Sequence, residues 1–127
     1  MTTRLARFGA INQGPGTPNF RMGLYADASS GPGSLVAQTA AATLLGGDAT
    51  YGVLDTNGQP ACIQLNGGTY YWLMALADAN YNLGFNTGGS AIPYRFFART
   101  FSSGLPDPAP ASSTQSTPAA NLYIVVE

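Results

Sequence analysis

The sequence has no histidine and no lysine, and charged residues make up only 9% of its 127 residues. Soluble domains usually carry about 25% charged residues, so this surface must be mostly neutral. Without histidine, the chain lacks the commonest general base and the commonest metal ligand. The arginines do not cluster into a patch that could neutralise consecutive phosphates, so no nucleic-acid partner is expected.

Cysteine is almost absent, because Cys62 is the only one in the chain. A single cysteine forms no disulfide within the chain, and without histidine it has no partner for a Cys-His nucleophile. Zinc sites draw on several Cys or His ligands, so neither a metal nor a cofactor is expected. Because Cys62 lies between Ala61 and Ile63, we predict that it is a small buried core residue.

Long hydrophobic runs are also missing. The longest, from Trp72 to Ala77, is far too short to cross a bilayer. The first residues, Met1–Arg7, lead into alternating polar and apolar positions without the apolar stretch of a signal peptide. We therefore expect a protein that is made in a cytoplasm and has no membrane partner.

The formal net charge is only −1. A chain so close to neutrality lacks the self-repulsion that keeps copies apart, which is compatible with dense packing against neighbours. A genome rich in G and C, which uses Arg, Ala and Gly in place of Lys, would give the same composition. The two interpretations are compatible and both stay open.

Glycine and proline are abundant, with 16 and 9 residues, and this disfavours long helices. Apolar residues alternate with polar ones in short segments bounded by Gly, Pro, Asn or Asp, which is typical of an all-β domain. We predict one antiparallel β-sandwich over residues 1–127, jelly-roll-like, with about eight or nine short strands. The expected strands are Arg4–Ile11, Phe20–Ala26, Ser34–Ala40, Tyr51–Leu54, Cys62–Leu65, Thr69–Ala77, Tyr81–Phe85, Tyr94–Phe101 and Leu122–Val126.

Residues 105–120 do not alternate in this way. Four prolines interrupt a run rich in Ala, Ser and Thr. We predict an extended connection that crosses one end of the sandwich and delivers the last strand, Leu122–Val126, into a sheet.

The acidic residues are few and form no paired motif. Asp27, Asp55 and Asp78 lie at predicted strand ends beside turn residues, where an Asp side chain ordinarily bonds to nearby backbone. The run Asp55–Gly58 resembles the start of a calcium loop but lacks the further acidic ligands that such a loop needs. We therefore predict that the protein is not an enzyme.

Aromatic residues are the remaining candidates for recognition. Tyr25 and Tyr71 are expected on the strand face opposite their apolar neighbours, and Tyr81 and Tyr94 flank predicted turns or strand ends. These four tyrosines are the candidate ligand or interface contacts, because flat rings with a polar tip stack on sugars or anchor protein interfaces. Ordinary filling of the sandwich is the alternative interpretation.

Three segments resemble a family of β-sandwich domains known from phage virion or tail proteins and from bacterial secreted proteins. They are Phe20–Asp27, the Gly-Pro-Gly turn and strand Gly31–Thr39, and the Leu-x-x-Gly-Thr-Tyr-Tyr-Trp-Leu strand Leu65–Leu73. The resemblance covers about the middle half of the chain. It implies a jelly-roll-like sandwich with a non-catalytic role, either in building a virion or in binding carbohydrate.

Such domains have an additional strand region before the segment that matches Arg4–Ile11, and here the chain begins close to that point. One sheet edge is therefore expected to be open to another chain. Together these observations predict a structural or adhesive virion protein, such as a capsid decoration or tail-fibre module. Its expected partners are copies of itself or other virion proteins, as a homo-oligomer or lattice component; the alternative is a carbohydrate-binding module that uses exposed tyrosines on a glycan.

Overall fold

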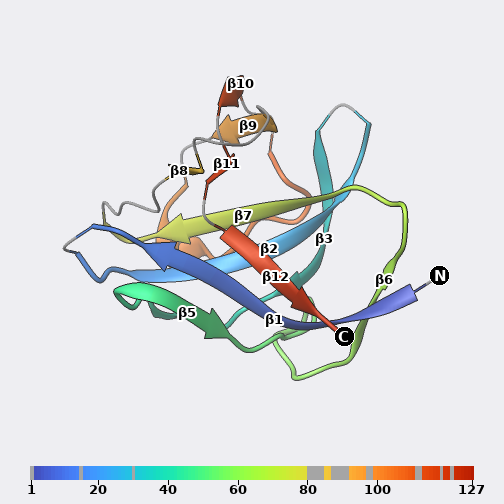
Figure 1. Ribbon diagram of the computed structural model, residues 1–127, viewed down its shortest axis with the longest axis horizontal. Helices are drawn as coiled ribbons and strands as arrows, with labels where there is room; N and C mark the ends of the chain where they lie inside the picture. Colours follow the sequence, from blue (N-terminus) through green and yellow to red (C-terminus); the bar gives the residue numbers. More distant parts are fainter. Residues whose placement is uncertain are drawn as a thin grey trace.

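The computed structural model describes residues 2–14, 16–29, 31–79, 85–86, 92–96, 99–110, 113–117, 119–120 and 122–127. Two four-stranded antiparallel sheets pack together in a β-sandwich, which confirms the predicted all-β class (Figure 1). The first sheet contains β1 (Thr2–Asn12), β5 (Gly47–Tyr51), β6 (Ile63–Asn66) and β12 (Leu122–Val126). The second sheet contains β2 (Asn19–Asp27), β3 (Pro32–Gln38), β4 (Ala42–Thr43) and β7 (Tyr71–Ala77).

Two short ribbons stand outside these sheets. One pairs β9 (Ile92–Phe96) with β10 (Ser113–Thr117), and the other pairs β8 (Phe85–Asn86) with β11 (Ala119–Ala120). No helix in the described part of the chain is both long and apolar enough to cross a membrane.

β1 is the central strand of the first sheet. On one side it pairs with β12, from Leu5 opposite Val126 to Ala10 opposite Leu122. On its other side, β6 covers the first half of β1 and β5 covers the second half. β1 therefore joins strands from the start, middle and end of the sequence.

β2 has the same central place in the second sheet. It pairs with β7 over seven positions, from Phe20 opposite Ala77 to Ala26 opposite Tyr71. β3 lies on its other side, with two register shifts, and β4 extends that side near Asn19. β2, the segment with the clearest alternation of apolar and polar residues, is thus a central strand with hydrogen-bonded neighbours along both edges.

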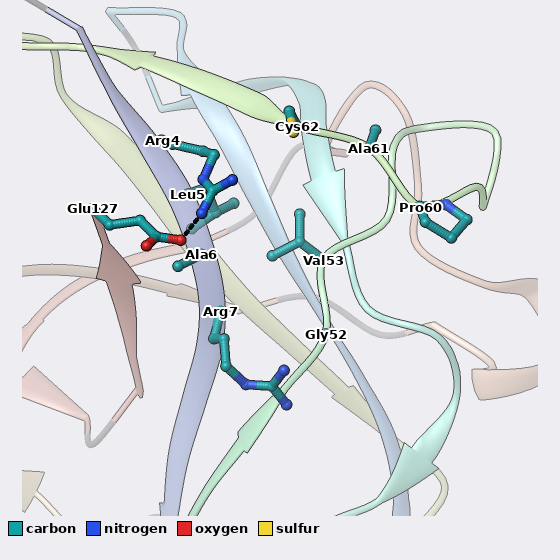
Figure 2. A pocket seen from close by; sticks show the side chains of 10 residues that line it. All are labelled: Arg4, Leu5, Ala6, Arg7, Gly52, Val53, Pro60, Ala61, Cys62 and Glu127. Atoms are coloured by element: carbon teal, nitrogen blue, oxygen red, sulfur yellow. Dashed lines mark hydrogen bonds and ion pairs between the residues drawn. The ribbon is translucent and has the colours of Figure 1, made fainter.

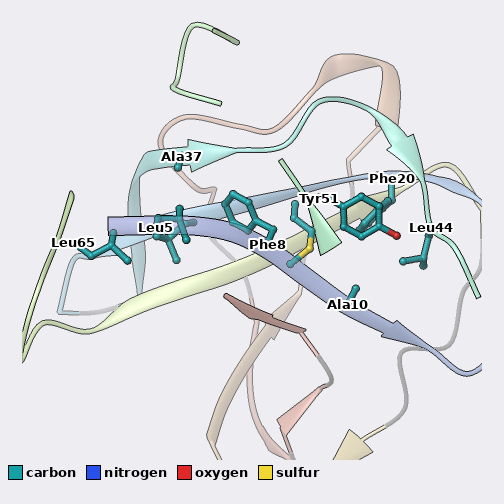
Figure 3. Packing of buried hydrophobic residues seen from close by; sticks show 10 residues of the cluster. Leu5, Phe8, Ala10, Phe20, Ala37, Leu44, Tyr51 and Leu65 are labelled. Atoms are coloured by element: carbon teal, nitrogen blue, oxygen red, sulfur yellow. The ribbon is translucent and has the colours of Figure 1, made fainter. Parts of the chain in front are cut away.

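The core lies between the two sheets (Figure 3). The inward positions of β1 and β2 recur at every second residue wherever no bulge intervenes, because side chains alternate across a strand. The rings of Phe20 and Tyr51 meet edge-on between the sheets, with centroids 4.9 Å apart. The buried members of this cluster are Leu5, Phe8, Ala10, Phe20, Met22, Leu24, Ala37, Leu44, Tyr51 and Leu65.

Asn12 is a buried polar residue at the end of β1. Its side-chain amide donates to the carbonyl oxygens of Gly16, at 2.8 Å, and Leu44, at 3.4 Å. Its Oδ1 accepts the N–H of Gly14 at 3.1 Å. Because buried polar groups are costly unless paired, Asn12 fixes the loop that carries the chain from the first sheet to the second.

The second sheet is also covered on its outer face, by residues 99–110, which we call the covering segment. Its Phe101 ring lies 5.4 Å from the guanidinium carbon of Arg21. Leu105 reaches the space above Gly23, where an added Cβ would lie 2.9 Å from Leu105 Cδ1. Further along, the Asp107 carboxylate accepts the Leu35 N–H at 3.0 Å. Described residues 105–110 of the predicted connection therefore lie against a sheet face.

The connection predicted at 105–120 is also interrupted by regular structure. Residues Ser113–Thr117 form β10, which pairs with β9 from Ser113 opposite Phe96 to Thr117 opposite Ile92. The absence of a hydrophobic period did not reveal this pairing, because Ser and Thr pair as strand residues once a partner strand is present.

Most strands of the two sheets lie where the alternation predicted them, but β4 and β5 do not. A strand was predicted at Tyr51–Leu54, whereas β5 ends at Tyr51. Gly47, the first residue of β5, has φ of 74°, the left-handed conformation that lets the chain turn into this strand. Leu54 then leaves the first sheet and exchanges backbone hydrogen bonds with Gln38, at 2.8 and 3.0 Å.

Candidate functional site

Tyr25, predicted as an exposed contact residue, is fully buried, with 0% of its surface accessible. Its hydroxyl donates to the carbonyl oxygen of Pro106 at 2.7 Å. Burial, followed by the nearby Asp107 carboxylate, raises the pKa of the Tyr25 phenol. The prediction is wrong because the covering segment closes over the outer face of β2, so this tyrosine serves the fold and is not open to a ligand.

Tyr71 also differs from its prediction. It is partly buried and packs against the core with Leu73 and Ala77, on the inner face of β7. Its hydroxyl accepts the N–H of Asn66 at 3.0 Å, which ties the end of β6 to β7. The apolar residues Trp72, Met74 and Leu76 instead lie on the outer face. Both faces of β7 are apolar, so alternation alone could not say which of them meets the core.

The other two candidate tyrosines cannot be placed as a site. Tyr81 lies outside the described residues, as does the side chain of Tyr94. The backbone of Tyr94 belongs to β9 and is paired with Gln115 of β10. Of the four candidates, the structure therefore places two side chains, and it brings neither to the surface as a free contact.

Among the described residues, Tyr70 is an exposed aromatic residue that the sequence pattern did not single out. It is 81% exposed, just before β7 begins. Its neighbour two positions on, Trp72, donates its indole N–H to Asp27 at 3.1 Å. The run of Tyr70, Tyr71 and Trp72 after a Gly-Gly turn was the available signal, but the choice among the three depended on where β7 starts.

The acidic side chains have structural partners. All five aspartates and Glu127 accept a hydrogen bond or form an ion pair, so none of the six stands as a free carboxylate. The predicted backbone contact is confirmed at Asp55, whose Oδ1 accepts the N–H groups of Asn57 and Gln59 at 2.8 and 3.0 Å. The other pairs are Asp27 with Trp72, Asp48 with Tyr123, Asp78 with Asn19, Asp107 with Leu35, and Glu127 with Arg4.

No set of three or more Cys, Asp or Glu side chains gathers anywhere in the described ranges in a way that could hold a metal ion. The Asp55–Gly58 segment is a tight turn in which the aspartate bonds to its own loop, and Gly58 has φ of 80°. Its carboxylate is thus directed at backbone N–H groups.

A hollow of about 550 Å³ opens beside β1, where the first sheet is incomplete (Figure 2). β6 pairs with β1 only as far as Leu5, and β5 begins to pair at Phe8. Residues 52–62 leave the sheet between these strands, opposite a bulge of β1 between Leu5 and Arg7. The hollow therefore lies within the first sheet, where β1 lacks a hydrogen-bonded neighbour between β6 and β5, and not between the two sheets.

The charged side chains that line this hollow already have hydrogen-bond or ion-pair partners. Arg4 forms an ion pair with Glu127, and Arg7 Nε donates to Thr50 Oγ1 at 2.8 Å. Val53 forms part of the wall (Figure 2). The recess therefore presents two guanidinium groups and one carboxylate that neighbouring side chains already hold in place.

Cys62 lies at the rim of this hollow and is exposed. The prediction of a buried core cysteine is wrong because Ala61 and Cys62 precede β6 in the segment that leaves the first sheet. The apolar neighbours in the sequence therefore did not mean an apolar environment.

We expect the Cys62 thiol to react with a small disulfide reagent such as DTNB in the native protein, with one thiol titrated per chain and no denaturant added. Absorbance at 412 nm gives the measurement. Labelling that needs denaturant would contradict the exposed position.

The outer face of the first sheet carries a tyrosine laid across a glycine. The Tyr123 ring covers Gly9, where an added Cβ would lie 2.2 Å from a ring carbon. The Tyr123 hydroxyl donates to the Asp48 carboxylate, and this hydrogen bond raises the pKa of the Tyr123 phenol. The Tyr123 side chain therefore extends from β12 across β1 to β5, over the outer face of its own sheet.

No protein-family model, no curated protein and no solved structure matches this chain.

Proposed function

We propose that this protein is a non-enzymatic structural or adhesive component of a phage particle, a capsid decoration or tail-fibre module that acts through protein–protein contacts. The observation that carries the proposal is the engagement of all six acidic side chains in structural hydrogen bonds or ion pairs. General acid–base catalysis needs a titratable group poised at a substrate, and this chain has neither histidine nor lysine to replace a carboxylate.

The virion location is supported by the three segments that resemble phage β-sandwich domains, Phe20–Asp27, Gly31–Thr39 and Leu65–Leu73. A neutral surface with a net charge of −1 allows copies to pack closely, because little long-range repulsion opposes them. The partners are copies of this chain or other virion proteins. Nucleic acid and membrane have no part in the proposal.

The test is the composition of particles released from cells that carry the gene in its native genome. After density-gradient purification, quantitative mass spectrometry should find the protein in a fixed copy number per particle, in step with the major capsid protein. A protein that is abundant in the cell lysate but absent from gradient-purified particles would contradict the virion location. Turnover of a polysaccharide that is lost in Asp78→Asn would contradict the non-enzymatic role.

A carbohydrate-binding module is the second candidate, and the exposure of Tyr70 favours it. An exposed ring can stack on the apolar face of a sugar. If this function holds, Tyr70→Ala should abolish binding on a glycan array, whereas Tyr70→Phe should keep it because the ring remains. Binding that is unchanged in Tyr70→Ala would exclude this ring as the platform.

A further inference from the structure

β12 forms an edge of the first sheet. Among the residues that the structure describes, it pairs with β1 alone, from Leu122 opposite Ala10 to Val126 opposite Leu5 (Figure 1). An edge strand carries a row of backbone groups that are available to another strand. The direction in which those groups point decides what can pair there.

The backbone bonds at the end of β12 settle this direction. Arg4 and Glu127 each donate an N–H to the other's carbonyl oxygen, both at 2.9 Å. In an antiparallel ladder, successive residues point their N–H and C=O alternately toward and away from the neighbouring strand. The bulge lies in β1 and leaves the alternation of β12 intact. Val126, Ile124 and Leu122 therefore direct their backbone groups away from β1.

Within the described strand β12, the sequence carries none of the features that usually protect an edge against pairing. The segment Leu122–Val126 contains no charge, no proline and no glycine. Val125 and Val126 are 39% and 45% exposed. The Tyr123 ring lies over Gly9 and does not overhang the edge. Edge strands of monomeric proteins are commonly blocked by lysine, proline or a bulge, and β12 has no such device.

We infer that β12 pairs with β12 of a second copy, antiparallel about a two-fold axis at Ile124, so that two first sheets become one continuous sheet. This inference rests on the proposed function, in which contacts between copies are the mode of action. In this register Ile124 faces Ile124 and Leu122 faces Val126 of the other copy. These are the same three residues whose backbone groups point outward, so each of their N–H and C=O groups finds a partner.

A second copy fits this edge better than an unrelated chain because the strand is complementary to itself. Ile124 opposite Ile124 and Leu122 opposite Val126 are uncharged apolar pairs, and apolar pairs that include β-branched residues are favourable across strands. The two Glu127 side chains lie at opposite ends of the paired strands, and each is already matched by its own Arg4. No like charges meet. A two-fold contact of this kind is the usual basis of homodimers.

The contact is small. Five residues on each side bury less than the roughly 800 Å² per partner of a stable complex, so one pair of strands is expected to associate weakly. Many copies held on one particle would raise the effective concentration and strengthen the contact. The dimer should therefore appear in solution only at high protein concentration.

The test is sedimentation equilibrium of the full chain in reducing buffer, over a concentration series up to the millimolar range. The parent should form dimers. Val126→Lys places a charge on the edge and should raise the dimer dissociation constant at least about tenfold. Val126→Pro removes one outward N–H without losing a bond to β1 and should have the same effect. Thr69→Lys, with the same charge change at an exposed position after the Gly67-Gly68 turn, should dimerise like the parent.

The two proposals fail in different ways. A parent that stays monomeric throughout the series, or a dimer that survives both Val126 variants, overturns the pairing through β12. If a dimer survives both Val126 variants, copies associate through another surface and the proposed function stands. Dimers that depend on Val126, combined with absence of the protein from purified particles, overturn the virion location alone. Circular dichroism of each variant must match that of the parent, so that loss of dimers is not loss of fold.

Discussion

Phe20→Ala is expected to lower the free energy of unfolding by about 3–5 kcal/mol. Phe20 is 1% exposed, and its ring meets that of Tyr51 at 4.9 Å with the ring planes 75° apart. Because Phe20 belongs to β2 and Tyr51 to β5, the truncation opens a cavity where the two sheets meet. Domains of this size are stable by about 5–15 kcal/mol, so the loss is a large part of the total. Equilibrium unfolding in urea, followed by far-ultraviolet circular dichroism, measures it.

The matched control is Tyr70→Ala, which removes an aromatic ring that is 81% exposed. Its effect on the free energy of unfolding should stay within about 0.5 kcal/mol, as for most surface substitutions. If both variants lose the same small amount, Phe20 does not lie in a packed core between the sheets. Equal and large losses would instead mean that Tyr70 packs against the fold.

The strands of the sandwich were predictable because their signals are local. In β2, Phe20, Met22 and Leu24 alternate with polar or small residues, and turn residues follow the strand. What covers the other face of β2 was not predictable in this way. The hydroxyl of Tyr25 bonds to Pro106, 81 positions away, and no period within β2 announces that contact. The alternation therefore predicts a surface position for Tyr25, which is in fact buried.

The same limit applies to the candidate site. Composition alone indicates that few groups are available for acid–base chemistry, and counting those groups requires no knowledge of which residues are in contact. The partners of the carboxylates are non-local, as in Asp48 and Tyr123, which are 75 positions apart. The exposure of Cys62 follows from a bulge in β1 and from the departure of residues 52–62 from the sheet. The residues that neighbour Cys62 in the sequence indicate neither of these two features.

Raising the pH above about 10 is expected to destabilise the native state through Tyr25. Burial, with the Asp107 carboxylate adding to it, raises the phenol pKa above its ordinary value of 10.0. A group whose pKa is higher in the folded state keeps its full stabilising contribution below the unfolded pKa and loses it as the pH rises toward the folded pKa. In that window the unfolded chain releases a proton that the folded chain retains, so the free energy of unfolding falls by about 1.4 kcal/mol per pH unit.

Urea unfolding between pH 8 and 12 measures this slope, and two phenylalanine variants identify its source. Tyr25→Phe should be less stable than the parent at pH 8, by about 1–3 kcal/mol, because the buried Pro106 carbonyl loses its donor. Its stability should then fall less steeply than that of the parent above pH 10, since the phenol that resists ionisation is gone. Tyr123→Phe, which changes a ring on the outer face of the first sheet, should retain the steep part that belongs to Tyr25. If Tyr25→Phe follows the parent slope across the whole range, the phenol is not sealed beneath the covering segment.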